Sequence, residues 1–217
     1  MGTNTVSRWL EDLIVRYPEL ISIQDSIIET YQIMETVYIN GGKVLIVGNG
    51  GSAADAEHIV GELMKGFVLP RAVDEIIRKE LLRIDKCRGE ILGKKLQKAL
   101  PAISLCGQDS LSTAYANDCD PLLCFAQKVY AYGNKEDVLL CLSTSGNSEN
   151  IVYAAVTARA RNMKVIAMTG KKESKISEIA DCCIKVPAKE TYKVQELHLP
   201  IYHTLCLMLE ERFFMDR

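Results

Sequence analysis

The sequence predicts an α/β fold in which a parallel sheet of five strands is flanked by helices. Five short apolar runs, at residues 43–47, 102–106, 138–142, 164–168 and 183–186, have the composition of buried parallel strands. Segments with apolar residues at helical spacing lie between these runs. Strands that alternate with helices are typical of right-handed crossovers and of a parallel sheet covered on both faces.

The helices expected around this sheet begin at the N-terminus. Residues 1–40 predict two helices separated by Pro18, and Gly41 with Gly42 ends the second. Further helices are expected at residues 52–65, 109–116, 122–131, 149–161 and 174–180, with a long helix at 192–214. Pro200 must lie near the start of that long helix or kink it. Because the chain has no linker or repeat, residues 1–217 are predicted to form a single domain.

Residues 66–100 differ from the rest of the chain because charged side chains dominate them. Apolar residues such as Ile77, Leu81 and Ile84 recur between the charges at helical spacing. This pattern predicts one or two ordered amphipathic helices with a solvated face. A role in binding a partner or in covering a site is the alternative interpretation.

Composition excludes several classes of protein. The formal net charge of −2 over 217 residues argues against a strongly basic nucleic-acid binder, and no direct nucleic-acid partner is expected. None of the eight cysteines forms a C-x-x-C pair, which favours reduced thiols in a cytoplasmic protein. No run of about 18 apolar residues predicts a membrane span. The first 16 residues lack the apolar core of a secretory signal.

Two loops that follow predicted strands have the composition of a phosphate site. The first, at residues 48–55, places glycines and Ser52 before a helix, whose free N–H groups attract anions. The second, at residues 143–148, carries four hydroxyls between a strand and a helix. Hydroxyls and backbone amides bind phosphate without any cation. Since ligands of parallel sheets bind at the carboxyl ends of strands, the two loops together predict a phosphorylated small ligand.

Only three histidines are present, so the position of each can be weighed separately. His58 and Glu62 are four residues apart and share one face of the helix that follows the first loop. Gln195 and His203 share a face of the C-terminal helix and lie about 12 Å apart along it. A carboxylate and an imidazole can exchange protons near neutral pH, so Glu62 and His203 are candidate acid–base residues. His198 lies on another face and is interpreted as a structural residue.

These residues carry a resemblance to a known family. The motifs are Gly48-Asn-Gly-Gly-Ser-Ala-Ala-Asp-Ala-Glu-His58, Asn117-Asp118, Ser143-Thr-Ser-Gly-Asn-Ser148 and Gln195-Glu-x-His-x4-His203. In this set and order they resemble the phosphoheptose isomerases of the sugar isomerase (SIS) superfamily. The resemblance implies a Rossmann-like SIS fold and a homotetramer with sites at subunit interfaces. It also implies the interconversion of sedoheptulose 7-phosphate and D-glycero-D-manno-heptose 7-phosphate through an enediol.

The resemblance also assigns roles to individual residues. It implies acid–base catalysis by Glu62 and His203, of which Glu62 is favoured as the base that removes the proton from carbon. It implies zinc binding by His58, Glu62, Gln195 and His203. The sugar-phosphate contacts that it implies are Asn49, Gly50, Gly51, Ser52, Glu62, Asn117, Asp118, Ser143, Thr144, Ser145, Ser148 and Gln195.

One departure from the family keeps other functions open. Residues 66–100 are longer than the corresponding family segment by roughly two to three dozen residues, which is enough for one or two extra helices. The first alternative is a non-catalytic SIS module that senses a sugar phosphate or binds a replication initiator. The second is an isomerase that acts on another ketose phosphate.

Overall fold

The computed structural model describes residues 3–215 and contains a single parallel sheet of five strands. The strands are β1 (Val44–Gly48), β2 (Ala102–Ser104), β3 (Val138–Leu142), β4 (Lys164–Thr169) and β5 (Cys182–Lys185). Their order across the sheet is β2-β1-β3-β4-β5. The predicted fold class is confirmed, and the bounds of the strands differ from the predicted ones by at most two residues.

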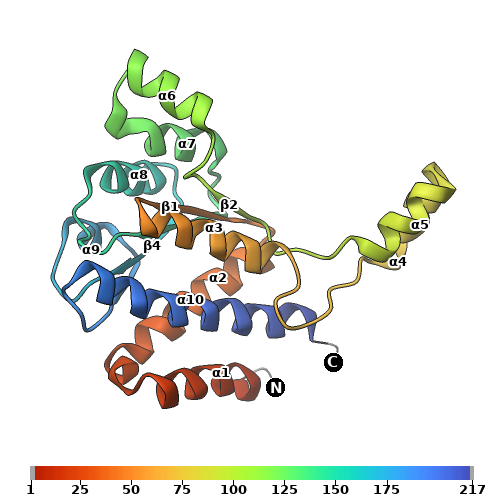
Figure 1. Cartoon of the computed structure of the whole chain (residues 1–217), viewed down its shortest axis with the longest axis horizontal. Coiled ribbons are helices and arrows are strands. Elements are labelled where there is room, and N and C mark those ends of the chain that lie inside the picture. The colour runs from red at the N-terminus through yellow and green to blue at the C-terminus, as the bar shows by residue number, and fades with distance from the viewer. Residues whose placement is uncertain (1–2, 216–217) are drawn as a thin grey trace.

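Helices cover both faces of the sheet because alternate side chains of each strand point to opposite sides. Val44 and Ile46 of β1 belong to a core that α2 (Gln24–Ile39), α3 (Gly51–Met64) and α10 (Thr191–Phe214) share. Leu45 and Val47 face a second core, which α7 (Cys124–Tyr132), α8 (Glu149–Ala160) and α9 (Lys175–Ile179) complete. In Figure 1, α7 and α8 lie on one side of the strands and α2 and α10 lie on the other.

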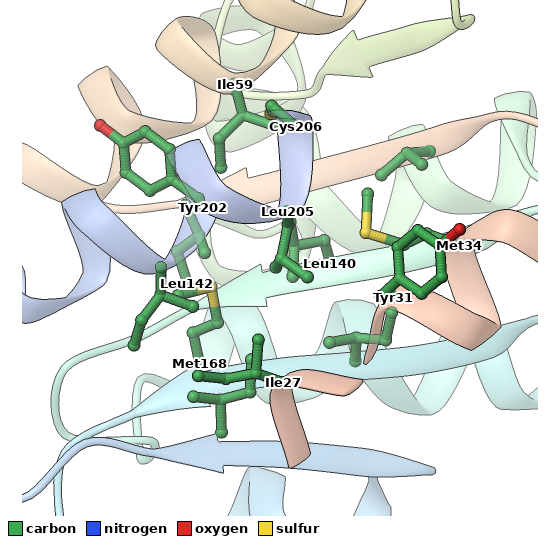
Figure 2. Close-up of a cluster of buried hydrophobic side chains, with 14 of the residues drawn as sticks. Ile27, Tyr31, Met34, Ile59, Leu140, Leu142, Met168, Tyr202, Leu205 and Cys206 are labelled. Atoms are coloured by element: carbon green, nitrogen blue, oxygen red, sulfur yellow. The ribbon is translucent and has the colours of Figure 1, made fainter. Parts of the chain in front are cut away.

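The larger core joins segments that are far apart in the sequence. Figure 2 shows Ile27, Tyr31 and Met34 of α2 beside Leu140 and Leu142 of β3, and the same cluster includes Met168, Leu205 and Cys206. α1 (Thr3–Arg16) packs against α10, and a 3-10 turn, η1 (Pro18–Ile23), links α1 to α2. Pro18 is the first residue of that turn, as predicted from its preset backbone angle.

The C-terminal helix α10 continues through Pro200, which was expected either near the start of the helix or at a kink. Pro200 is the tenth of 24 residues, so it does not lie near the start of the helix. A proline in a helix removes one hydrogen bond and typically costs about 3 kcal/mol. Half of the residues of α10 are buried, including Ile201, Leu205 and Leu209, and this packing offsets that cost.

Within residues 66–100, two helices extend from the molecule. α4 (Glu75–Ile84) and α5 (Lys86–Lys95) pack against each other as an antiparallel hairpin, so the one or two helices predicted here are two. We call residues 74–98 the arm. In Figure 1 the arm projects away from the sheet and from all other labelled helices.

The remaining elements lie between β2 and β3. α6 (Asp109–Asp118) and a short 3-10 turn, η2 (Pro121–Leu123), precede α7. All eight cysteines are free thiols, and Cys141, Cys182 and Cys206 are buried, whereas Cys87 and Cys119 are exposed. Among residues 3–215, no helix is both long and apolar enough to cross a membrane.

Candidate active site

The order of the strands brings the two predicted phosphate loops together. β1 and β3 are neighbours, and Gly48 at the end of β1 is paired with Leu142 at the end of β3. The chain leaves β1 toward β2 on one side and reaches β3 on the other, so this is the point where the strand order reverses. Ligands of open α/β sheets bind in the crevice at such a point.

A cavity of about 250 Å³ lies between these loops and the first turn of α10. Eight predicted ligand-binding residues line it, namely Asn49, Gly50, Gly51, Ser52, Ser143, Thr144, Ser148 and Gln195. Leu142 and Thr191 complete the lining. No side chain that lines it is charged, so an anion there would be held by hydroxyls, amides and the N-terminus of α3.

The loop after β3 is held in shape by its own hydrogen bonds. The backbone N–H of Gly146 donates to Ser143 Oγ over 3.1 Å, and that of Asn147 donates to Ser145 Oγ over 3.2 Å. Gly146 has φ +65° and a Cβ there would lie 2.1 Å from Ser174 Oγ, so only glycine fits. Asn49 and Asn150 exchange two amide hydrogen bonds of 3.0 and 2.9 Å, which tie the two loops together.

A second group of side chains lies further along the same two helices. His58 and Glu62 of α3 face His203 of α10: His58 Nε2 is 3.4 Å from His203 Nε2 and 3.4 Å from Glu62 Oε1. The side chain of His58 is 43% exposed and that of Glu62 is 12% exposed, so the group is open to solvent on one side. Burial, together with the neighbouring His58, lowers the pKa of His203, while Glu62 opposes that change.

Sequence reasoning missed two residues that orient His58. Tyr202 Oη donates to Asp55 Oδ1 over 3.1 Å and is 3.1 Å from His58 Nδ1. With the tyrosine proton directed to Asp55, the tyrosine oxygen can accept a hydrogen bond from Nδ1–H in one tautomer of His58. A neutral imidazole then has an unprotonated Nε2 that faces Glu62 and His203. Asp55 is three residues before His58 on α3, and Tyr202 is next to His203. This proximity in the sequence is the signal that could have identified both residues.

The backbone of Glu62 is fixed by an ion pair that is fully buried. Arg71 Nη2 donates to the carbonyl oxygen of Glu62 over 3.1 Å and Nη1 donates to that of Leu63 over 2.6 Å. The Arg71 Nε is 2.9 Å from Glu210 Oε1 of α10. Lys65 Nζ approaches the Glu62 carboxylate itself, at 3.1 Å. These contacts leave the candidate base on a rigid support.

Not every predicted site residue lies at the cavity. Asn117 and Asp118 are the last residues of α6, where they are exposed and hydrogen-bonded to each other over 2.9 Å. Ser145 is on the outer side of its loop, in a neighbouring cavity of about 220 Å³. His198 is fully buried against the carbonyl oxygen of Thr169, in agreement with its interpretation as a structural residue.

The predicted zinc ligands are only partly gathered. The 3.4 Å separations at His58 Nε2 match the spacing of two ligand atoms of one tetrahedral zinc, about 3.3 Å for bonds of about 2.05 Å. Gln195 lies instead at the cavity, with its amide next to Gly51. Within residues 3–215, no three His, Cys, Asp or Glu side chains are already placed around a common metal position. The donor types suit zinc, and a complete ligand set requires side chains to rotate.

The chain is similar in sequence to known proteins. A family model described as the SIS domain matches residues 92–170. The phosphoheptose isomerase of Helicobacter pylori (strain P12) is 36% identical over 194 residues, which cover 89% of this chain and 88% of that protein. The chain belongs to the phosphoheptose isomerase family. The relative from Aneurinibacillus thermoaerophilus is 35% identical over 83% of this chain and 78% of its own length.

Solved structures of this family share the fold. The phosphoheptose isomerase from Francisella tularensis superposes with a TM-score of 0.74 and 29% identity, over 97% of this chain and 99% of that one. The one from Neisseria gonorrhoeae gives a TM-score of 0.70 and 29% identity, over 95% and 93% of the two chains. The family consists of phosphosugar isomerases, which are enzymes, so the non-catalytic alternative is not favoured.

Proposed function

We propose that the protein is an aldose–ketose isomerase that interconverts sedoheptulose 7-phosphate and D-glycero-D-manno-heptose 7-phosphate. The observation that carries this proposal is the placement of a neutral, hydroxyl-lined cavity and a His–Glu–His group along the same two helices, α3 and α10. The first feature suits a phosphate and the second suits proton transfer.

The distance between the two features favours a long substrate. Ser52 and His58 are six residues apart on α3, and Gln195 and His203 are eight apart on α10, which corresponds to roughly 9–12 Å along each helix. An extended sugar with its phosphate in the cavity would place a carbon several bonds away beside Glu62. A heptulose 7-phosphate, with its carbonyl at the opposite end from the phosphate, has this shape.

Proton transfer is assigned to Glu62 and His203. Glu62 removes the proton from the carbon next to the carbonyl and returns it to the former carbonyl carbon, while His203 moves the hydroxyl proton between the two oxygens of the intervening enediol. The lowered pKa of His203 keeps it neutral at physiological pH, so that it can both donate and accept a proton. Hydrogen bonds from Asp55 through Tyr202 hold the imidazole of His58, which neighbours both Glu62 and His203.

Substitution of the proposed acid–base residues tests this assignment. Glu62→Gln and His203→Ala are each expected to lower turnover of sedoheptulose 7-phosphate by at least 100-fold, while the dissociation constant of the sugar phosphate changes only a few-fold. Turnover is followed by product NMR and binding by calorimetry. Glu57→Gln, an exposed carboxylate on the same helix, is the matched control and should retain wild-type turnover. Wild-type turnover by Glu62→Gln would refute the assignment.

We also propose that His58, Glu62, Gln195 and His203 bind zinc. When bound, zinc would act as a Lewis acid that polarises the oxygens of the reacting carbons. The support is the 3.4 Å spacing of His58 Nε2 to its two neighbours, Glu62 Oε1 and His203 Nε2. Protein purified without chelator should contain about one zinc per chain by elemental analysis, and His58→Ala should lose most of it. A metal-free protein that is fully active in EDTA would refute the proposal.

Three other features stay predictions. The homotetramer with interfacial sites can be checked by sedimentation velocity. A role of Asn117 and Asp118 in sugar binding requires the sugar, or a second copy of the chain, to reach α6. A panel of pentose, hexose and heptose phosphates would distinguish the heptose reaction from that of another ketose phosphate.

A further inference from the structure

The arm has no hydrophobic core of its own. α4 contains no buried residue and α5 contains only Gly89, although each helix is ten residues long. Neither helix packs extensively against any other described element, and Figure 1 shows the pair projecting into open space. Helices shorter than about 12–15 residues are marginal in water unless tertiary packing supports them. The arm therefore needs a surface that covers it.

The apolar residues of the arm show which of its parts need covering. Six large apolar side chains are exposed there, namely Ile76, Ile77, Ile84, Ile91, Leu92 and Leu96. Ile76 is 76% exposed and Ile84 is 74% exposed. Single exposed apolar side chains are common, but a concentration of them on one projecting hairpin marks an interaction site.

The charge of the arm restricts its partner. Residues 74–98 contain eight Lys and Arg and five Asp and Glu, which gives a net charge of +3. Each of the five carboxylates pairs with a Lys or Arg of the arm itself. Within the described part of the chain, Lys79, Lys86 and Lys95 have no ion-pair partner. The uncovered arm thus presents apolar side chains together with free positive charge.

The N-terminal helices present the complementary surface. Residues 8–40 contain six Asp and Glu and two Arg, which gives a net charge of −4. The carboxylates of Glu11, Glu19, Asp25 and Glu29 are on exposed residues and form no ion pair with any residue between 3 and 215. Val15 is 78% exposed and Ile21 is 64% exposed in the same segment. This surface is acidic and partly apolar, as a partner for the arm should be.

The base of the arm fixes its direction. Arg71 and Glu210 form a buried ion pair, and the carboxylate of Glu210 also accepts the backbone N–H groups of Phe67, Val68 and Leu69. Ala72 and Gln97 form a short antiparallel bridge at the point where the arm leaves the body. A rigid base holds the arm away from the acidic surface of its own chain, so a second molecule must provide that surface.

We propose that the arm docks on the N-terminal helices α1, η1 and α2 of a second copy of this chain. The exchange is reciprocal, so that two copies related by a twofold axis bury two arms. The occupant is a copy of the chain because its acidic, apolar surface matches the basic, apolar arm in charge. The inference does not depend on the isomerase reaction and would stand if that reaction were refuted.

Cross-linking between distinguishable copies tests the contact. A chain of natural isotope composition carries the photoreactive residue p-benzoylphenylalanine in place of Ile84, and a ¹⁵N-labelled chain does not. After subunit exchange and irradiation, peptide mass spectrometry should find residue 84 joined to ¹⁵N peptides from residues 8–40. Cross-links to other ¹⁵N peptides, to no ¹⁵N peptide, or mainly to another protein when the experiment is repeated in cells would overturn the proposal.

Charge reversal tests the same contact by its energetics. Lys79→Glu, Lys86→Glu and Lys95→Glu together should raise the dissociation constant of self-association at least tenfold in sedimentation velocity. The matched triple replacement by Arg should associate like the wild type. Adding Glu11→Lys, Glu19→Lys and Glu29→Lys to the triple Glu variant should restore association, which a merely unfolded arm would not allow. Unchanged association of the triple Glu variant, or a monomeric wild type at tens of micromolar, would refute the proposal.

Discussion

One missing side chain keeps the cavity open between α3 and α10. A Cβ at position 51 would lie 2.5 Å from Nε2 of Gln195, which lines the cavity. Gly51→Ala would therefore displace the end of Gln195 rather than the backbone. We expect the KM for the sugar phosphate to rise about 10- to 150-fold, since one hydrogen bond to a charged group is worth about 1.5–3 kcal/mol. Steady-state kinetics and calorimetry measure this change.

The matched control for this prediction is on the same helix. A Cβ at Gly61 of α3 would meet no atom within 4 Å. Gly61→Ala should leave the KM unchanged and stabilise the protein by about 0.5–1 kcal/mol, because alanine loses less backbone entropy in a helix. If Gly51→Ala binds the sugar phosphate like the wild type, Gln195 does not contribute to binding from its position beside Gly51.

At the scale of residues, the sequence located the two loops that line the cavity but not every residue beside them. Ser52 and Ser143 follow strands within recognisable glycine- and hydroxyl-rich motifs, so local composition was enough. Thr191 reaches the same cavity from the start of α10, and only the packing of α10 on the sheet places it there. Tyr202 is only 1% exposed and is therefore easily taken for a residue of the core alone. Its hydroxyl group nevertheless orients His58.

Among the elements, the segment between α3 and the arm depends on one carboxylate. Glu210 accepts three backbone hydrogen bonds of 2.7–3.1 Å and pairs with Arg71, and both side chains are fully buried. Glu210→Gln would leave the guanidinium of Arg71 buried without a counter-charge. We expect a loss of about 3–5 kcal/mol in the free energy of unfolding, measured by urea denaturation.

An exposed ion pair of the arm provides the comparison. Glu80 pairs with Arg83 at 2.8 Å, but both side chains are more than half exposed. Glu80→Gln should change the free energy of unfolding very little, because solvent screens such pairs. Similar losses for Glu80→Gln and Glu210→Gln would show that burial does not decide the strength of the Arg71–Glu210 pair.

The sequence predicted the elements better than their packing. Apolar runs and helical spacing located all five strands and both helices of the arm, because these signals are local. Pro200 shows the limit of a local rule, since burial of its helix outweighs the hydrogen bond that proline removes. The projection of the arm could not be predicted either, because helical spacing does not show which face packs against the body.

For the whole molecule, strand order determines whether the site exists. The sequence shows only the order of the strands along the chain. In the sheet, β1 lies between β2 and β3, so that β3 is a direct neighbour of β1. This arrangement brings Asn49 next to Asn150, about 100 residues away, and closes the cavity. The resemblance to a family implied such a sheet, whereas the alternation of strands and helices alone is compatible with other orders.

The stability of the whole molecule should depend on pH through a residue outside the site. Burial lowers the pKa of His198 to about 4, and its Nδ1 has no hydrogen-bond partner among the described residues. The unfolded chain, with a histidine pKa of about 6.5, binds this proton more readily than the folded one. Folding is therefore unaffected by His198 above pH 6.5 and becomes less favourable as the pH falls from 6.5 toward 4. By the linkage relation, His198 lowers the free energy of unfolding by about 2 kcal/mol between pH 7 and pH 5.

Urea unfolding at both pH values should show that the wild type loses about this much more than His198→Gln, in which His203 still titrates. Equal losses in the two proteins would mean that His198 takes up its proton in the folded state as easily as in the unfolded chain.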